Sequence, residues 1–389
     1  MQQRRILEEQ KMALPERTAA LAQWLAAHPW RLPHWQLFLL RVVQGDQRGL
    51  LAWLAAWILR LLSLIYGAGL ALNLLPYRLW PALAFRLPAR VFSIGNLTVG
   101  GTGKTSAAAA LAQALSRSGE RVALLSRGYS GQLAGVVSDG RRVMMSASQA
   151  GDEPFLLAHR LPGVAVLVGK DRRITGRVAT RFLRATALVL DDGSQYWKMH
   201  KDLELVLVDA LNPFGFGRLL PSGLLREPIG SIKRARQIWL THCDLVPTSH
   251  MERLEKTVRR LSPGAQIIRT RHKPTSLAEI GGRPVALESL DGRPLIALSS
   301  IGSPEAFERT LMRLGAKPMA MRFRDHHRYS THDVELIGSI AARLGRAVVT
   351  TEKDAVRLPP SGWRVPCLVL CVEISAMNGE QLPWPAQQP

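Results

Sequence analysis

The sequence predicts an α/β protein with a parallel sheet core, a second smaller α/β lobe and an apolar helix on the N-terminal side. Three observations lead to this prediction. From residue 91 onward, short apolar runs alternate with helical stretches. The first of these runs leads into a glycine-rich loop and then a helical segment, and residues 49–76 form the most apolar stretch of the chain. Strands separated by helices indicate βαβ units and therefore a parallel sheet.

Composition limits the class of protein. A chain of 389 residues with 47% hydrophobic residues can form more than one packed core, and it is too apolar for a disordered protein. Three cysteines without paired CxxC motifs argue against a disulfide framework and against structural zinc, and they indicate a reducing compartment. The net charge of +21 favours a polyanionic partner, either an anionic membrane or a phosphorylated substrate. Because nucleic-acid-binding motifs are lacking, we expect no nucleic-acid partner.

The N-terminal part divides into an extension, residues 1–45, and a membrane-associating region, residues 46–90. Within the extension, 13–27 has the pattern of a short amphipathic helix. Arg60 interrupts the apolar stretch 49–76, whereas a membrane span needs roughly 20 apolar residues. Three interpretations remain open: a helix lying in the membrane interface, a true span, and a buried core helix. Flanking arginines and aromatic residues favour membrane contact.

Beyond residue 90 we expect a core, 91–275, and a C-terminal lobe, 276–389. Residues 272–293 are rich in turn residues and are expected to form the junction between them. Helices are expected at 105–117 and 304–314. The candidate strands are 91–94, 121–125, 164–168, 187–190, 204–208, 237–240, 294–298, 346–350 and 367–371.

The glycine-rich loop lies within VFSIGNLTVGGTGKT, residues 91–105, between the first strand and its helix. In this context Lys104 would place a positive charge on nucleotide phosphates and the Thr105 hydroxyl would bind Mg²⁺. A strict phosphate-loop pattern requires glycine where Thr98 stands, and the alternative is a simple glycine turn. The motif predicts a P-loop NTPase-like core. Backbone N–H groups that would hold the phosphates belong to Gly100, Gly101, Thr102 and Gly103.

Acidic residues at strand ends are candidate metal ligands. Asp191 and Asp192 follow one apolar strand, and Asp209 follows the next as a rival. A phosphate-loop enzyme needs a carboxylate for Mg²⁺ at such a position, which favours the paired aspartates over a capping role. In GDEPFLLA, Asp152 and Glu153 begin a helix and would equally serve as helix caps.

Two further motifs carry titratable groups. RDHHRYS, residues 324–330, is compatible with a metal site, a catalytic site or a polar loop. In TTEKDAVRL, Lys353 and Asp354 follow a strand and would contact nucleotide or cap the next helix.

Taken together, these stretches resemble the tetraacyldisaccharide 4′-kinase family of lipid A biosynthesis. The resemblance covers residues 91 to about 372 in the family's order and includes the variant phosphate loop. The stretches that carry it are SIGNLTVGGTGKT, LLSRGYSG, GDEPFLLA, VGKDR, LDDGSQ, DLELVLVDALNPFGFGRLLPSGLLREP, SSIGSPEAFERTLMRLGA, FRDHHRYS and VVTTEKDAVRL.

The resemblance implies phosphorylation of the 4′-hydroxyl of a lipid-bearing disaccharide 1-phosphate, with ATP and Mg²⁺, at the cytoplasmic face of a bacterial inner membrane. It implies peripheral or monotopic attachment and no obligatory protein partner. By position, it makes Asp152 the catalytic base and His326 its partner, beside Lys104 as a catalytic residue. It also implies nucleotide contacts from Gln195 and Arg226, and it assigns the metal to Thr105, Asp191, Asp192 and Glu227.

The chain departs from the family pattern at several positions. Ser194 and Tyr196 replace the Phe and His that usually flank the glutamine, and Ser106 replaces a common proline. Phe216 and Leu224 replace a common Asn and Pro. Two alternatives to the kinase are left. One is a nucleotide-switch ATPase or GTPase acting on a protein partner, which would use the same glycine-rich loop. The other is a catalytically degenerate membrane-bound relative, which the Ser194 and Tyr196 changes suggest.

Overall fold

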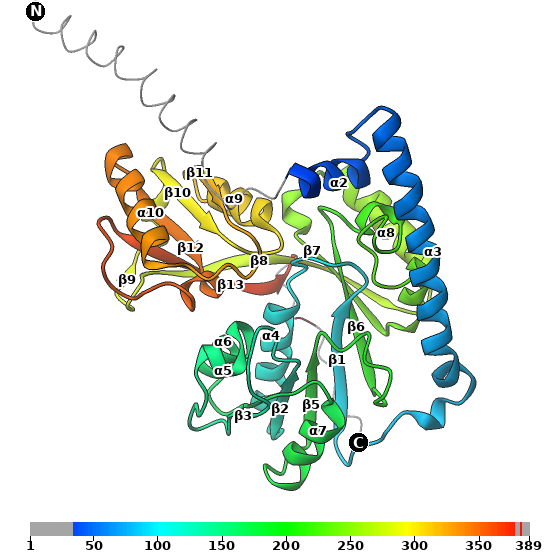
Figure 1. The fold of residues 1–389 in the computed structure, drawn as a ribbon. Helices are drawn as coiled ribbons and strands as arrows, with labels where there is room; N and C mark the ends of the chain where they lie inside the picture. Colours follow the sequence, from blue (N-terminus) through cyan, green and yellow to red (C-terminus); the bar gives the residue numbers. More distant parts are fainter. Residues whose placement is uncertain (1–33, 378–381, 383–389) are drawn as a thin grey trace, which may run out of the picture.

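The computed structural model describes residues 34–377 and residue 382. The expected helix at 13–27 lies outside these residues. Figure 1 shows two halves joined side by side, with the long helix α3 along one flank. The helices are α2 (His34–Gln44), α3 (Leu50–Leu79), α4 (Lys104–Arg117), α5 (Ala147–Ala150), α6 (Asp152–Arg160), α7 (Arg172–Arg181), α8 (Thr248–Leu261), α9 (Pro304–Arg313), α10 (Thr331–Leu344) and α11 (Glu352–Ala355).

The strands form one sheet in the order β11-β10-β12-β13-β8-β7-β6-β1-β5-β2-β4-β3, with β9 paired to β8. Most neighbours are parallel, and β3–β4, β8–β9 and β8–β13 are antiparallel. The strands are β1 (Arg90–Asn96), β2 (Val122–Ser126), β3 (Gly135–Ser138), β4 (Ala165–Val168), β5 (Ala187–Asp191), β6 (Leu203–Asp209), β7 (Gln237–Thr241), β8 (Gln266–Glu279), β9 (Pro284–Val285), β10 (Pro294–Ser299), β11 (Lys317–Arg322), β12 (Ala347–Thr351) and β13 (Cys367–Ala376).

All nine predicted strands are present, and the predicted helices correspond to α4 and α9. The predicted parallel α/β architecture is therefore confirmed. Its central strands are almost wholly apolar because helices cover both faces of the sheet, as expected for parallel sheets.

The junction expected at 272–293 has a different form, because much of it is strand. β8 begins beside β7 in the first half and continues beside β13 into the second half. The division expected after residue 275 falls inside this strand, and Ile374 of β13 packs in a core cluster of the first half. The two halves are therefore connected by a pair of hydrogen-bonded strands rather than by a loop.

Helix α3 is largely exposed. It has 30 residues, a length of about 45 Å at 1.5 Å per residue, and only Ala52 and Leu74 are buried along it. Its most apolar 18-residue window has a mean hydropathy of 1.8 with 6% of that window buried. This exposure contradicts the core-helix interpretation and is consistent with membrane association. The helix is long and apolar enough to cross a membrane, so both membrane interpretations remain open.

Two side-chain hydrogen bonds join α3 to the loop that contains Leu219 and Arg226. The Ser63 hydroxyl donates to the carbonyl of Leu219 at 3.0 Å, and the Tyr66 hydroxyl donates to the carbonyl of Arg226 at 2.8 Å. Gly67 lies against Leu219, where a larger residue would bring its Cβ within 3.1 Å of the leucine side chain. The helix therefore packs on the loop that contains Arg226.

Candidate active site

The phosphate loop lies between β1 and α4 at the centre of the sheet. β1 is flanked by β5 and β6, so its carboxyl end opens beside those of two parallel neighbours. Gly100 and Gly103 have φ of 119° and 88°, a backbone conformation that favours glycine. The loop is followed directly by the N-terminus of α4, whose unpaired N–H groups and dipole suit an anion.

Lys104 begins α4 and points back over the loop. Its Nζ donates to Asn96 Oδ1 at 3.1 Å and lies 3.8 Å from Asp192 Oδ1. Burial lowers the pKa of Lys104, and the charge of Asp192 opposes this shift. The side chain is therefore held near the strand ends from which the candidate carboxylates project.

The pKa values of the paired aspartates at the end of β5 are shifted in opposite directions. Burial, together with the negative charges of Glu153 and Asp192, raises the pKa of Asp191 to about 7. Burial also acts to raise the pKa of Asp192, but Lys104 and Arg226 outweigh it and lower that pKa. Arg226 Nη1 lies 2.8 Å from Asp192 Oδ2. Lys104 and Lys353 oppose the shift at Asp191 without reversing it, so a cation bound there would be favoured by the surrounding negative charge.

The other predicted nucleotide and metal residues fall in two places. Gln195 joins the phosphate loop, because its amide donates to the carbonyl of Asn96 at 2.9 Å. Glu227 is fully buried and, among the described residues, forms an ion pair with Arg234. Its role as a metal ligand stays a prediction. Asp209, the rival to the paired aspartates, contacts His242 Nδ1 at 2.9 Å and is thereby engaged elsewhere.

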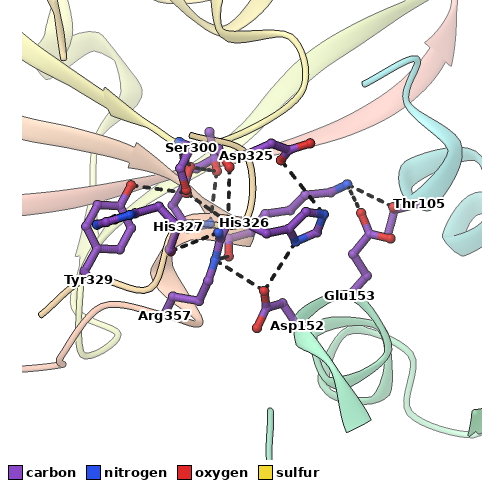
Figure 2. A network of polar contacts seen from close by, with 12 residues as sticks. Thr105, Asp152, Glu153, Ser300, Asp325, His326, His327, Tyr329 and Arg357 are labelled. Carbon is purple, nitrogen blue, oxygen red and sulfur yellow. Dashed lines mark hydrogen bonds and ion pairs between the residues drawn. The ribbon is translucent and has the colours of Figure 1, made fainter. Parts of the chain in front are cut away.

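Asp152 and His326 come together from opposite halves of the molecule (Figure 2). His326 Nδ1 lies 3.6 Å from Asp152 Oδ2, and Asp325 Oδ1 lies 3.9 Å from His326 Nε2. The facing carboxylate of Asp152 raises the pKa of His326, with burial opposing and Asp325 adding to the shift. Tyr129 stacks on the His326 ring with centroids 6.1 Å apart.

Asp152 lies in the first turn of α6 and is not its N-cap residue. The N-cap of α6 is Gly151, with φ of 93°, and no side chain caps the helix from that position. Asp152 instead faces His326 and also Arg357, whose Nε lies 3.4 Å from Asp152 Oδ2. Asp354 holds Arg357 in turn, at 3.0 Å.

The two residues singled out in TTEKDAVRL have separate roles. Asp354 is fully buried and receives hydrogen bonds from Ser300 and from Thr351 beside it. Lys353 reaches the other half of the molecule, where its Nζ donates to Thr105 Oγ1 at 3.0 Å and lies 2.5 Å from Glu153 Oε1. Thr105 and Glu153 therefore face a cation from the second half (Figure 2).

Sequence reasoning missed the roles of three residues of this site: Glu153, Arg357 and Asn96. For Glu153 the sequence pattern indicates only a helix cap, and its place next to Asp152 is the one available signal of a role in the site. Arg357 and Asn96 carried no signal, since their contacts depend on how the chain folds. Tyr196, a departure from the family pattern, donates from its hydroxyl to Asp171 at 2.6 Å, and Arg172 lies over its ring.

The fold and site define a class: an α/β protein with a nucleotide-phosphate loop, facing a carboxylate–imidazole pair formed between its two halves. Comparison with known proteins identifies the family within this class. The family model for tetraacyldisaccharide-1-P 4′-kinase matches residues 55–383. The chain belongs to this family.

Individual relatives agree with this assignment. The tetraacyldisaccharide 4′-kinase of Anaeromyxobacter dehalogenans strain 2CP-C is 46% identical over 316 residues, covering 77% of this chain and 83% of the relative. That of Syntrophus aciditrophicus is 38% identical, covering 82% and 89%. A solved structure, the apo form of LpxK from Aquifex aeolicus in complex with ATP, is 31% identical with a TM-score of 0.63, covering 81% and 93%.

Proposed function

We propose that this chain transfers the γ-phosphoryl group of ATP to the 4′-hydroxyl of a lipid A disaccharide 1-phosphate. The observation that supports this most strongly is the placement of Asp152 and His326, from opposite halves, beside a phosphate loop that carries Lys104. A nucleotide switch needs the loop but not the acid–imidazole pair. Phosphoryl transfer to an alcohol uses both.

In this proposal the loop holds the nucleotide and positions the transferred group. Backbone N–H groups at the start of α4 bind phosphate oxygens, and Lys104 and Arg226 add positive charge. Arg226 is already oriented by Asp192, and Gln195 braces the loop through the Asn96 carbonyl. Phosphoryl transfer depends chiefly on such positioning and charge neutralisation.

Magnesium fits the residues present. Thr105 and Asp191 supply oxygen atoms, the ligand type that Mg²⁺ prefers, and a cationic group already lies between Thr105 and Glu153. Within the described part of the chain, no group of three or more His, Cys, Asp and Glu side chains is placed to hold a metal by itself. Thr105, Asp191 and Asp192 would hold the ion together with nucleotide phosphates, and the ion would neutralise charge on the transferred group.

Asp152 is the proposed base. Its carboxylate accepts the proton of the sugar hydroxyl as that oxygen attacks phosphorus, and His326 orients the carboxylate. Arg357, fixed by Asp354, supports the same carboxylate from another side. The base therefore comes from the first half, and the groups that orient it come from the second half.

The acceptor's acyl chains remain in the bilayer, so the enzyme has to work at the membrane surface. The exposed apolar face of α3 and the net charge of +21 suit an anionic membrane. We place the protein at the cytoplasmic face of the inner membrane, attached peripherally or monotopically. The proposal requires neither a nucleic acid nor an obligatory protein partner.

One assay tests the proposal: transfer of labelled γ-phosphate from ATP to lipid A disaccharide 1-phosphate in mixed micelles. We expect acceptor-dependent formation of labelled lipid. Hydrolysis of ATP without labelled lipid would indicate the nucleotide-switch alternative. Absence of both activities in a folded, ATP-binding protein would indicate the degenerate relative.

A further inference from the structure

The Lys353 side chain links the second half of the molecule to the phosphate loop. It begins in α11, immediately after β12, and contacts two residues of the first half. One is the hydroxyl of Thr105, at 3.0 Å, and the other is the carboxylate of Glu153, at 2.5 Å. The Lys353 side chain keeps an exposed fraction of 34%, so the contact is not sealed inside a core.

The surroundings of this ammonium group are those of a cation site. Burial acts to lower the pKa of Lys353, but the charges of Glu153 and Asp191 outweigh it and keep the pKa above its ordinary value. For Glu153, burial acts to raise the pKa, while Lys353 and then Lys104 lower it to about 2. The ammonium therefore lies among oxygen atoms that include the hydroxyl expected to bind the metal.

An ammonium group and a magnesium ion cannot both occupy the space in front of the Thr105 hydroxyl. The Lys353 ammonium donates to one of the two lone pairs of the Thr105 hydroxyl oxygen, and its positive charge would repel a divalent cation bound to the same oxygen. We propose that Lys353 fills the divalent-cation position in the nucleotide-free enzyme and is displaced when magnesium nucleotide binds. This inference rests on the proposed function, since it concerns the same nucleotide site.

Displacement of Lys353 would affect the contacts that surround the proposed base, Asp152. Lys353 is followed directly by Asp354, which receives hydrogen bonds from the backbone and side chain of Ser300. Asp354 also holds Arg357, and Arg357 contacts Asp152. Lys353, Asp354 and Arg357 belong to one short segment. This segment therefore contacts both the metal position and the carboxylate of Asp152. Lys353 is thus a positioning residue: its displacement by the metal would shift the segment of the second half that contacts Asp152.

The test compares nucleotide binding with and without magnesium. Dissociation constants of ADP are measured by calorimetry on the full chain, in Mg²⁺ and in EDTA, for the natural protein and for Lys353→Met. Methionine keeps the length of the side chain and removes its charge. Without metal, the ammonium attracts the phosphates, so the variant should bind ADP more weakly. With metal, the variant has lost a competitor for the site, so it should bind ADP more tightly.

The decisive quantity is the ratio of the EDTA to the Mg²⁺ dissociation constant. We expect Lys353→Met to increase this ratio about tenfold or more, the effect of one charged hydrogen bond. Lys353→Gln, which still donates a hydrogen bond, should change the ratio in the same direction and replaces Lys353→Met should that variant not fold. Lys317→Met, at the exposed start of β11, is the matched control and should leave the ratio unchanged.

A ratio that stays the same or falls in a folded Lys353 variant would overturn the inference. Failure of the proposed function is distinguishable from this result. If the natural protein transfers phosphate to the lipid acceptor while the ratio is unchanged, only the role of Lys353 is refuted. If the natural protein binds no nucleotide under either condition, both ideas are refuted.

Discussion

Substitution of the proposed base is the most informative perturbation of this site. Asp152→Asn preserves the shape of the side chain and removes its ability to accept a proton. General acid–base groups contribute about 10²–10⁴ to the rate, so we expect kcat to fall by this factor. At 1.36 kcal/mol for each tenfold change, the barrier rises by about 3–5 kcal/mol. The affinity for ATP should change much less, because Asp152 faces His326 and Arg357.

The stability effect should be small by comparison. The Arg357 side chain is only 6% exposed, so a lost charge partner has an energetic cost. Asp354 still holds Arg357 at 3.0 Å, and asparagine can still accept a hydrogen bond from it. We therefore expect a loss of about 1–3 kcal/mol in the free energy of unfolding, the range for hydrogen bonds to charged groups. Thermal unfolding and steady-state kinetics on the same preparation separate the two effects.

His326→Ala provides the partner measurement. It should also lower kcat by about 10²–10⁴, and the double variant should lose little beyond the worse single variant, because groups that act as a unit are non-additive. His332→Ala, on the exposed surface of α10, is the matched control and should retain full activity. A fully active Asp152→Asn protein would refute the assignment of the base. Multiplicative losses in the double variant would refute the pairing with His326.

The remaining predictions concern the phosphate loop, the pKa of His326 and the attachment of the chain to membranes. Lys104→Ala should abolish transfer in a protein with native circular dichroism, and normal activity of this variant would show that the loop is only a structural turn. Asp192→Asn should raise the Mg²⁺ concentration needed for half-maximal activity. In Asp152→Asn, the pKa of His326 measured by NMR should fall, because its main cause of elevation is removed while burial remains, and a constant pKa would contradict this. Since the folded pKa of His326 lies above the unfolded value of about 6.5, its stabilising effect is full below that pH and is lost as pH rises through the folded pKa. The full chain should sediment with membranes, and a chain starting near residue 88 should be partly released; resistance of the full chain to salt and carbonate, with its N-terminus on the opposite face, would establish a span.

The elements predicted from sequence share a clear physical signal. The nine predicted strands are short apolar runs, since helices bury both faces of the parallel sheet. Other strands lacked this signal. β8 alternates exposed and half-buried polar residues where it bridges the halves, β11 has the mixed sequence KPMAMR at the sheet edge, and β3 and β9 have four and two residues. Hydrophobic patterning cannot find strands that are held by pairing rather than by burial.

The candidate site shows the same division between local and long-range information. Loop residues such as Lys104 and Thr105 were predictable because their relation is set by a few consecutive backbone conformations. Other contacts join residues far apart in the sequence. Lys353 and Thr105 are separated by 248 positions, and Arg357 likewise contacts Asp152 from the other half of the molecule. Their geometry depends on how the β8–β13 pair orients the two halves. Side chains at that interface have no local sequence pattern that identifies their partners.

The attachment of α3 connects the proposed membrane-binding helix to the region of the phosphate loop. The Tyr66 hydroxyl bonds to the backbone of Arg226, whose guanidinium holds Asp192 beside the phosphate loop. A helix joined by a flexible linker would allow the site to rotate relative to the bilayer. Here the Tyr66 hydroxyl of α3 donates to the carbonyl of Arg226 at 2.8 Å, and the Ser63 hydroxyl donates to the carbonyl of Leu219 at 3.0 Å. Orientation of α3 by a membrane would therefore also orient the phosphate loop, which reduces the freedom lost when a lipid headgroup and ATP are brought together.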